Sequence, residues 1–141
     1  MIEIKLLGEP KAQKRHRHGY RGGKPHTYDP SAPDKADFLA LIHNSAPKEP
    51  FLGPLSLTCK FFCGRPKSHY RTGKYSDQLK PTAPIWVKSR PDIDNYLKFI
   101  LDSANGVLFK DDSQVVKVKL MKAYSVTPRV ELFLEELSET N

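Results

Sequence analysis

Three aspartates and one lysine have the residue types and the spacing that phosphodiester hydrolysis requires. Asp92 stands just before a helix that we predict over 93–104, and Asp94 lies in its first turn. Lys98 and Asp102 follow Asp94 at intervals of four residues, so these three side chains share one side of the predicted helix. Carboxylates in such a group can hold a metal ion, and the lysine can face a phosphate.

A second acidic pair, Asp111 and Asp112, precedes an alternating strand expected over 114–123. Because a helix and the strand after it are commonly neighbours in space, we expect this pair to approach Asp92 and Asp94. Clustered carboxylates repel one another without a cation, and Mg²⁺ prefers hard oxygen ligands. The pattern therefore predicts a Mg²⁺-dependent phosphodiester hydrolase, with Mn²⁺ as a substitute ion.

Each of these acids also has an ordinary structural role open to it. Asp92 could cap the helix, which is a common role for aspartate. Asp94 and Lys98 could form a simple ion pair across one helical turn. Asp111 and Asp112 could belong only to a turn.

The charge balance favours a polyanionic partner. The chain has 23 Lys and Arg against 16 Asp and Glu, a net charge of +7, and nucleic acid is the usual partner of such a protein. Basic residues and aromatics are interleaved in two segments expected to be loops, 8–31 and 64–84. Solvated loops without a ligand are the alternative interpretation. The expected DNA contacts are Lys11, Lys14, Arg15, Arg17, Arg21, Lys67, His69, Arg71, Lys74 and Arg90.

The chain reads as one α+β domain, 1–141, with a mixed sheet of about five strands and two main helices. Phe38, Leu41 and Ile42 mark the buried face of the first helix, and Ser31 with Asp34 suggests a capping box. Val116, Val118 and Leu120 mark one face of the fourth strand. We expect strands near 2–7, 54–62, 84–88, 114–123 and 128–136, the last two paired as a hairpin, and helices near 33–45 and 93–104.

No signal peptide and no apolar run long enough to span a membrane are visible, so we expect a soluble intracellular protein with reduced cysteines. Cys59 and Cys63 with His69 could form a zinc site. However, Cys59 alternates with the apolar residues of a strand, and the spacing fits no common zinc pattern. The His16 and His18 pair is expected to contact solvent or phosphate rather than a metal.

The motif around the predicted catalytic helix closely resembles the RusA family of bacteria and their phages. The family core reads as a basic residue, then Asp-x-Asp-Asn-x-x-Lys, an Asp, a Gly and Asp-Asp-x-Gln-Val-Val. The resemblance covers about residues 88–120, and the stretch 65–70 is similar to phage-borne members. The matching residues here are Arg90, Asp92, Asp94, Asn95, Lys98, Asp102, Gly106, Asp111, Asp112, Gln114, Val115 and Val116.

The resemblance implies a RusA-like homodimer that cuts four-way DNA junctions symmetrically with Mg²⁺, in recombination and repair within a bacterial or phage-infected cell. It implies that Asp92, Asp94 and Asp112 are the essential acids and metal ligands. It assigns the catalytic lysine to Lys98, which would stabilise phosphate charge or orient or protonate a reacting group. Asp102 and Asp111 match acidic positions in supporting roles. The alternatives are a nuclease for flaps or forks and a non-catalytic DNA-binding module.

Overall fold

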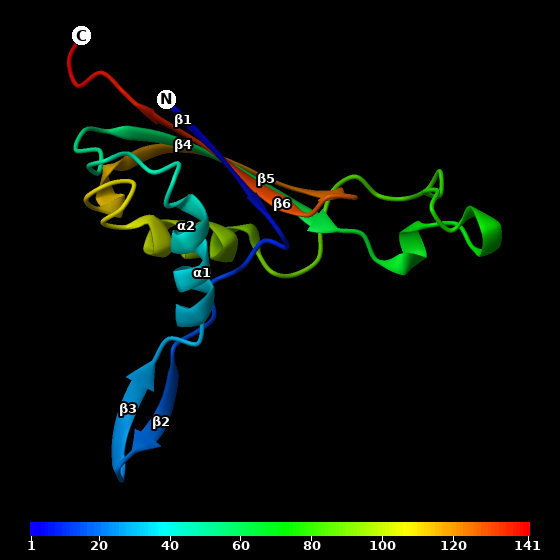
Figure 1. The fold of residues 1–141 in the computed structure, drawn as a ribbon, viewed down its shortest axis with the longest axis horizontal. Coiled ribbons are helices and arrows are strands. Elements are labelled where there is room, and N and C mark those ends of the chain that lie inside the picture. Colours follow the sequence, from blue (N-terminus) through cyan, green and yellow to red (C-terminus); the bar gives the residue numbers. More distant parts are fainter.

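The computed structural model describes residues 1–141 and has an α+β architecture in which two helices cover one face of a four-stranded sheet (Figure 1). The expected fold class is confirmed, with four strands in the mixed sheet. The sheet strands are β1 (Ile2–Leu7), β4 (Leu55–Gly64), β5 (Val115–Ser125) and β6 (Arg129–Glu136). The helices are α1 (Ala32–Ile42) and α2 (Ile93–Ala104), and β2 (Arg17–Arg21) and β3 (Lys24–Tyr28) form a separate hairpin.

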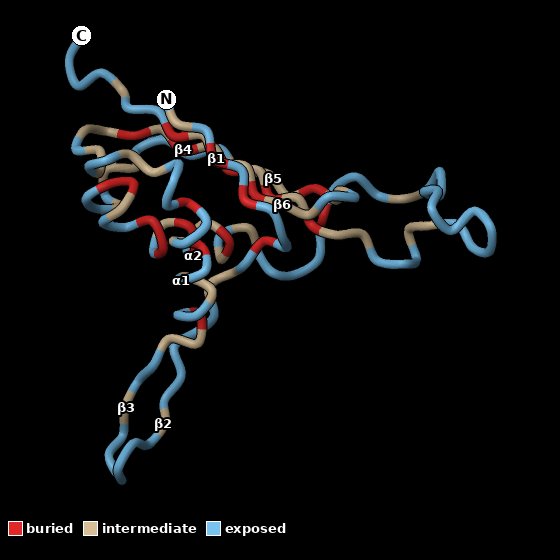
Figure 2. Tube along the Cα trace, in the orientation of Figure 1, coloured by how far each residue is buried: buried red, intermediate tan, exposed pale blue.

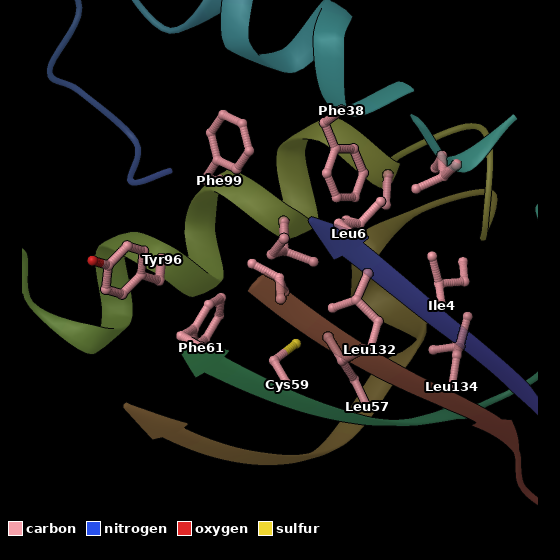
Figure 3. Close-up of a cluster of buried hydrophobic side chains, with 14 of the residues drawn as sticks. Ile4, Leu6, Phe38, Leu57, Cys59, Phe61, Tyr96, Phe99, Leu132 and Leu134 are labelled. Carbon is pink, nitrogen blue, oxygen red and sulfur yellow. The ribbon is translucent and has the colours of Figure 1, made fainter. Parts of the chain in front are cut away.

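β4 is a central strand whose alternating side chains build the core. It pairs with β5 in parallel and with β6 antiparallel, and β1 pairs antiparallel with β6. Figure 3 shows its apolar side chains meeting those of the two helices, where Phe38 of α1 contacts Phe99 of α2 edge to face at 6.0 Å between ring centroids. The side chains of β4 buried beneath the helices are Leu55, Leu57, Cys59, Phe61 and Cys63.

The expectation that β5 and β6 pair with each other is wrong. The strand order is β1-β6-β4-β5, so β4 lies between them. β4 is buried on the helix side along its whole length, which favours the centre of the sheet. The connection from Ser125 to Arg129 needs to span two strand spacings, about 10 Å, and four Cα steps reach about 15 Å.

The expectation that Val116, Val118 and Leu120 share one face of β5 is wrong for Val116. The register shifts where Leu55 and Ser56 of β4 meet β5, and Val116 is the extra residue at that bulge. Val118 and Leu120 therefore face the helix side, while Val116 does not continue their row. Val116 is 63% exposed and Val118 42% exposed, because β5 is an edge strand of the sheet.

Two segments differ from the elements expected for them. The basic segment 8–31 contains the β2–β3 hairpin, whose turn residues Gly22 and Gly23 both have positive φ, 57° and 77°. The strand expected at 84–88 is only a bridge between Trp86 and Ala123. The chain leaves the β5 edge soon after this bridge and turns toward α2.

The first helix is shorter than expected, ending at Ile42, and its start is built differently. Ser31 occupies the N-cap position but forms no capping bond, because its hydroxyl accepts the Lys14 N–H at 2.9 Å. The predicted capping box with Asp34 is therefore absent. Phe38 and Ile42 are buried as expected, whereas Leu41 is 59% exposed.

Two basic segments extend from the body in different directions (Figure 1). One is the β2–β3 hairpin, and the other is the segment 64–84, which contains two short 3₁₀ turns, Lys67–His69 and Gly73–Tyr75. Figure 2 shows that both are largely exposed. No helix in the structure is long and apolar enough to cross a membrane.

Candidate functional site

Asp92 occupies the N-cap position of α2, but its side chain does not cap the helix. Its backbone is extended, with φ −66° and ψ 148°, and its carboxylate accepts no capping hydrogen bond. The residue is exposed. Both oxygens are therefore free to bind a ligand, next to the positive end of the helix dipole.

Asp94 and Lys98 are also exposed, and they do not form the ion pair that their spacing permits. No contact within 4 Å joins the Asp94 carboxylate to a cation, and Lys98 has no acidic partner. Lys98 lines a polar groove with Asn95 of the same helix and with the segment 13–16. The ammonium group is available to an anion in this groove.

The segment that leads into α2 is fixed by a residue that the sequence analysis missed. Lys122 of β5 donates two hydrogen bonds, at 2.8 Å to the carbonyl oxygen of Ser89 and at 2.7 Å to that of Pro91. Its ammonium also lies 5.9 Å from the ring centroid of Tyr96. Lys122 lies on the same side of β5 as the apolar residues that face the helices, and it pairs with the buried Phe61. A lysine in that alternating row was the sequence feature that could have indicated its role.

Tyr96 anchors the first turn of α2 from inside the core. Its ring stacks on Phe61 with centroids 4.9 Å apart (Figure 3). Its hydroxyl lies 3.6 Å from the Cys63 sulfur. Burial raises the pKa of both the Tyr96 hydroxyl and the Cys63 thiol, so both stay protonated at neutral pH. Asp92 and Asp94 thus project from a helix end whose backbone is held by packing on one side and by Lys122 on the other.

The second acidic pair lies at the start of a 3₁₀ turn, Asp112–Gln114, and its two members differ in what their carboxylates bind. Asp111 caps this turn, accepting hydrogen bonds from the Ser113 N–H and hydroxyl, and the Ser113 hydroxyl bond lowers the pKa of the Asp111 carboxyl. Gln114 donates to the carbonyl oxygens of Phe51 and Gly53 at 2.8 and 3.0 Å. Asp111 and Gln114 therefore have structural roles, while the Asp112 carboxylate has no hydrogen bond or ion pair.

The structure does not bring the three expected ligands together within one chain. Asp92 directly precedes α2, and Asp112 follows its other end, after a segment in which Phe109 forms a bridge with Asn105 at the end of the helix. A helix of 12 residues is about 18 Å long, far more than one metal ion can bridge. No group of three or more His, Cys, Asp or Glu side chains is placed to hold a metal. The expected approach of Asp111 or Asp112 to Asp92 and Asp94 does not occur in the single chain.

Asp102 is engaged elsewhere. Its carboxylate lies 3.7 Å from the ammonium of Lys35 on α1. Lys35 also pairs with Asp29, and this bond, with others from Ser31 and Gln13, lowers the Asp29 pKa to about 2. Asp102 thus belongs to a polar contact between the helices and borders the groove that contains Lys98.

The expected DNA-binding residues form three exposed groups. Lys11, Lys14 and Arg15 belong to the segment that runs along α2, where the Gln13 N–H donates to the Asn95 carbonyl oxygen at 2.9 Å. Arg90 lines a second hollow beside Asp92, together with Arg65. The remaining expected contacts lie on the two projecting segments and are Arg17, Arg21, Lys67, His69, Arg71 and Lys74.

His69 is an exception among these residues, because its ring packs edge to face against Tyr124 at 4.7 Å between centroids. It also lies beside Arg65, whose guanidinium donates to the Pro84 carbonyl oxygen at 2.7 Å. These contacts hold the base of the 64–84 segment. The alternative zinc site is not formed, because Cys59 is fully buried in the core, where burial raises its pKa to about 12.

Comparison with known proteins identifies relatives along nearly the whole chain. A family model described as endodeoxyribonuclease RusA matches residues 8–135. The uncharacterised protein YqaN of Bacillus subtilis (strain 168) is 37% identical over 144 residues, which cover 97% of each chain. A protein of Lactococcus phage r1t described as crossover junction endodeoxyribonuclease rusA is 29% identical over 139 residues, covering 96% of this chain and 97% of its own.

Proposed function

Because the chain belongs to the RusA endodeoxyribonuclease family, we propose that it is a divalent-metal-dependent endonuclease that resolves four-way DNA junctions. One observation carries the assignment of its residues. Asp92, Asp94 and Asp112 have carboxylates without a partner in the chain, whereas the neighbouring acids Asp102 and Asp111 are engaged. Among the acids that flank α2, the three without structural partners are the ones available to a metal ion.

The donor chemistry fits Mg²⁺. Carboxylate oxygens are hard ligands, and Asp92 and Asp94 are exposed at a helix end where DNA can approach. A bound Mg²⁺ would activate water and neutralise charge at the scissile phosphate, and Mn²⁺ is expected to substitute. Lys98, one helical turn from Asp94, would hold a phosphate oxygen. Lys122 would keep the backbone before Asp92 in place without touching the substrate.

The separation of Asp92 and Asp112 within one chain supports a homodimer. A junction presents two equivalent strands, and a twofold axis supplies two sites at a fixed separation. In the proposed dimer, the first turn of α2 in one copy receives Asp112 from the second copy. Each site would then contain two carboxylates from one chain and one from the other, and the enzyme would cut both strands symmetrically during recombination and repair in the cytoplasm.

Cleavage of synthetic DNA tests the function. The protein is incubated with a four-way junction, a flap, a fork and a linear duplex, each with Mg²⁺, with Mn²⁺ or with EDTA. We expect paired cuts in the junction only when a metal is present, and little cutting of the duplex. Preferred cleavage of the flap or fork would show that the substrate is another branched DNA and not the four-way junction. Binding without cleavage of any substrate would support a non-catalytic DNA-binding module.

A further inference from the structure

The two faces of the β2–β3 hairpin differ in chemistry. Directly paired residues of an antiparallel hairpin project on the same side, and the pairs are Arg17 with Tyr28, Gly19 with His26 and Arg21 with Lys24. We call the side formed by these six residues the basic–aromatic face. All three permanent cations of the hairpin lie on it, and the opposite face carries His18, Tyr20, Pro25 and Thr27.

The aromatic part of this face consists of His26 and Tyr28, whose rings stack on each other and pack against Gly19. The rings of His26 and Tyr28 are stacked, with centroids 5.6 Å apart and an angle of 29° between their planes. A Cβ at Gly19 would lie 3.2 Å from His26 Cε1 and 3.5 Å from Tyr28 Cε1, so the absence of a side chain lets the rings lie on β2. Tyr28 keeps 43% of its surface exposed. An outer ring surface is therefore available to a planar ligand.

The basic part of the face lacks an anion within the chain. Arg21 and Lys24 are directly opposite each other beside the turn, and like charges in such a pair destabilise a hairpin. The hairpin contains no acidic residue, and Asp29, just beyond β3, is engaged by Lys35. A phosphate between Arg21 and Lys24 would remove the repulsion.

The hairpin is attached to the first turns of α2 by polar contacts. The Gln13 N–H donates to the Asn95 carbonyl oxygen at 2.9 Å, and the Gln13 side chain donates to Asp29 at 3.0 Å. Asp29 also accepts the Ser31 N–H at 2.9 Å. Both ends of the hairpin are therefore tied together next to Asp94 and Lys98, and DNA lying along α2 would continue toward the hairpin.

We propose that the basic–aromatic face holds an unpaired DNA strand beside the cleavage site. Arg17, Arg21 and Lys24 bind its phosphates, and the His26–Tyr28 stack receives a base on the outer face of Tyr28. Bases inside a duplex are stacked on one another and cannot lie on this ring, whereas bases at an open branch point can. This inference rests on the proposed function and adds that the hairpin selects branched over linear DNA.

Binding measurements in EDTA test the inference independently of cleavage. Fluorescence anisotropy gives the affinity of the full-length protein for an oligothymidine, a four-way junction and a linear duplex. We expect Tyr28→Ser to weaken oligothymidine binding roughly tenfold and junction binding in the same direction, while duplex binding changes little. Gly19→Val, which displaces the rings without changing charge, should have the same effect.

Matched variants assign the effect to one face. Tyr20→Ser removes an aromatic ring that is 80% exposed on the opposite face, and it should leave all three affinities unchanged. Arg21→Ser should reduce the slope of log affinity against log salt by about one, and by more than Lys48→Ser, an equal change of charge on the distant loop before β4.

Unchanged oligothymidine affinity in Tyr28→Ser and Gly19→Val, in proteins with wild-type thermal unfolding, would overturn the inference. An equal loss in Tyr20→Ser would also overturn it. The proposed function fails by a separate result, which is the lack of metal-dependent cutting by the wild-type protein.

Discussion

The aspartates around α2 differ in what their carboxylates bind within the chain. Asp102 binds Lys35, and Asp111 binds the Ser113 backbone and hydroxyl, so each has a structural role. Asp92 and Asp94 have no such partner, although they stand where a cap and an ion pair could form. The sequence spacing alone does not show what each carboxylate binds, because an aspartate at these positions can cap the helix, form an ion pair or bind a metal ion.

Asp94→Asn is expected to abolish cleavage while preserving DNA binding. The amide is a weaker metal ligand, and we expect cleavage to fall more than 100-fold, which corresponds to about 2.7 kcal/mol of lost transition-state stabilisation. Junction affinity in EDTA should stay the same or increase, because a negative charge near phosphates is removed. Single-turnover cleavage measures the effect, with Asp37→Asn on the exposed side of α1 as the control. Wild-type cleavage by Asp94→Asn would remove Asp94 from the site.

Asp29 provides a pH-dependent contribution to stability. Its pKa falls from 3.8 to about 2 in the folded chain, chiefly through the hydrogen bond from Lys35. Because the folded value is the lower one, this stabilisation is complete above about pH 5 and is lost as pH falls from there toward 2. Asp29→Asn should therefore lower the free energy of unfolding by about 1 kcal/mol at pH 7.

Urea unfolding at several pH values between 7 and 2.5 measures this difference. The stabilities of the wild type and Asp29→Asn should converge at the acidic end, whereas Asp37→Asn, at an aspartate with no ion pair, should not reproduce that convergence. A constant difference across the range would contradict the assigned role of the Asp29 charge.

At the scale of elements, β5 positions α2 through Lys122. Lys122→Met keeps an apolar stem beside Tyr96 but removes both hydrogen bonds to the Ser89 and Pro91 carbonyl oxygens. Because these are charge-assisted bonds in a partly exposed site, we expect a loss of about 1 kcal/mol in stability. The rate of cleavage should fall roughly tenfold, since loss of a contact that orients metal ligands typically lowers metal affinity or activity by at least that factor.

Lys119→Met serves as the control for Lys122→Met, because Lys119 is exposed on the other face of β5. The comparison uses urea unfolding and the Mg²⁺ dependence of cleavage, since weaker positioning of Asp92 should raise the Mg²⁺ concentration needed for half-maximal rate. An unchanged Mg²⁺ requirement in Lys122→Met would show that Lys122 does not position the metal ligands.

Elements with a strong local pattern were predictable, and those set by competition between strands were not. Tyr96, Ile100 and Ala104 recur at the four-residue spacing of a buried helical face, and α2 has the bounds predicted for it, 93–104. β4 lies between β5 and β6 because its buried face is the most apolar. Predicting this order requires comparing all strands of the chain with one another, which no local pattern does. The Gly22-Gly23 turn did carry a local hairpin signal, which the basic composition of 8–31 obscured.

At the scale of the whole molecule, the sequence indicated the residues of the proposed site but not how they are arranged. The motif contains Asp92, Asp94 and Asp112 at fixed offsets, and the neighbourhood rule for a helix and its following strand suggested that they meet. The rule fails here because β5 runs back along α2. Asp112 therefore lies near the C-terminal end of α2, whereas Lys122 contacts the segment before its N-terminal end. The seven residue steps of β5 from Val115 to Lys122 span about 23 Å, more than the length of α2 at about 18 Å, so Lys122 reaches the segment before the helix.

In the proposed dimer, each site combines Asp92 and Asp94 of one copy with Asp112 of a second copy. Differently tagged chains are co-expressed, and two heterodimers are purified and assayed for cutting of a four-way junction with Mg²⁺. In the first, one chain carries Asp94→Asn and the other Asp112→Asn, so one composite site remains intact. In the second, a wild-type chain is paired with a chain carrying both substitutions, so both composite sites are broken.

Measuring strand cuts by these two heterodimers therefore tests the account most directly. A shared site predicts that the first heterodimer nicks one strand, while the second heterodimer and both singly substituted homodimers are inactive. The reverse pattern, in which the wild-type chain cuts beside its doubly substituted partner and the first heterodimer is inactive, would contradict the account and place all three carboxylates in one chain.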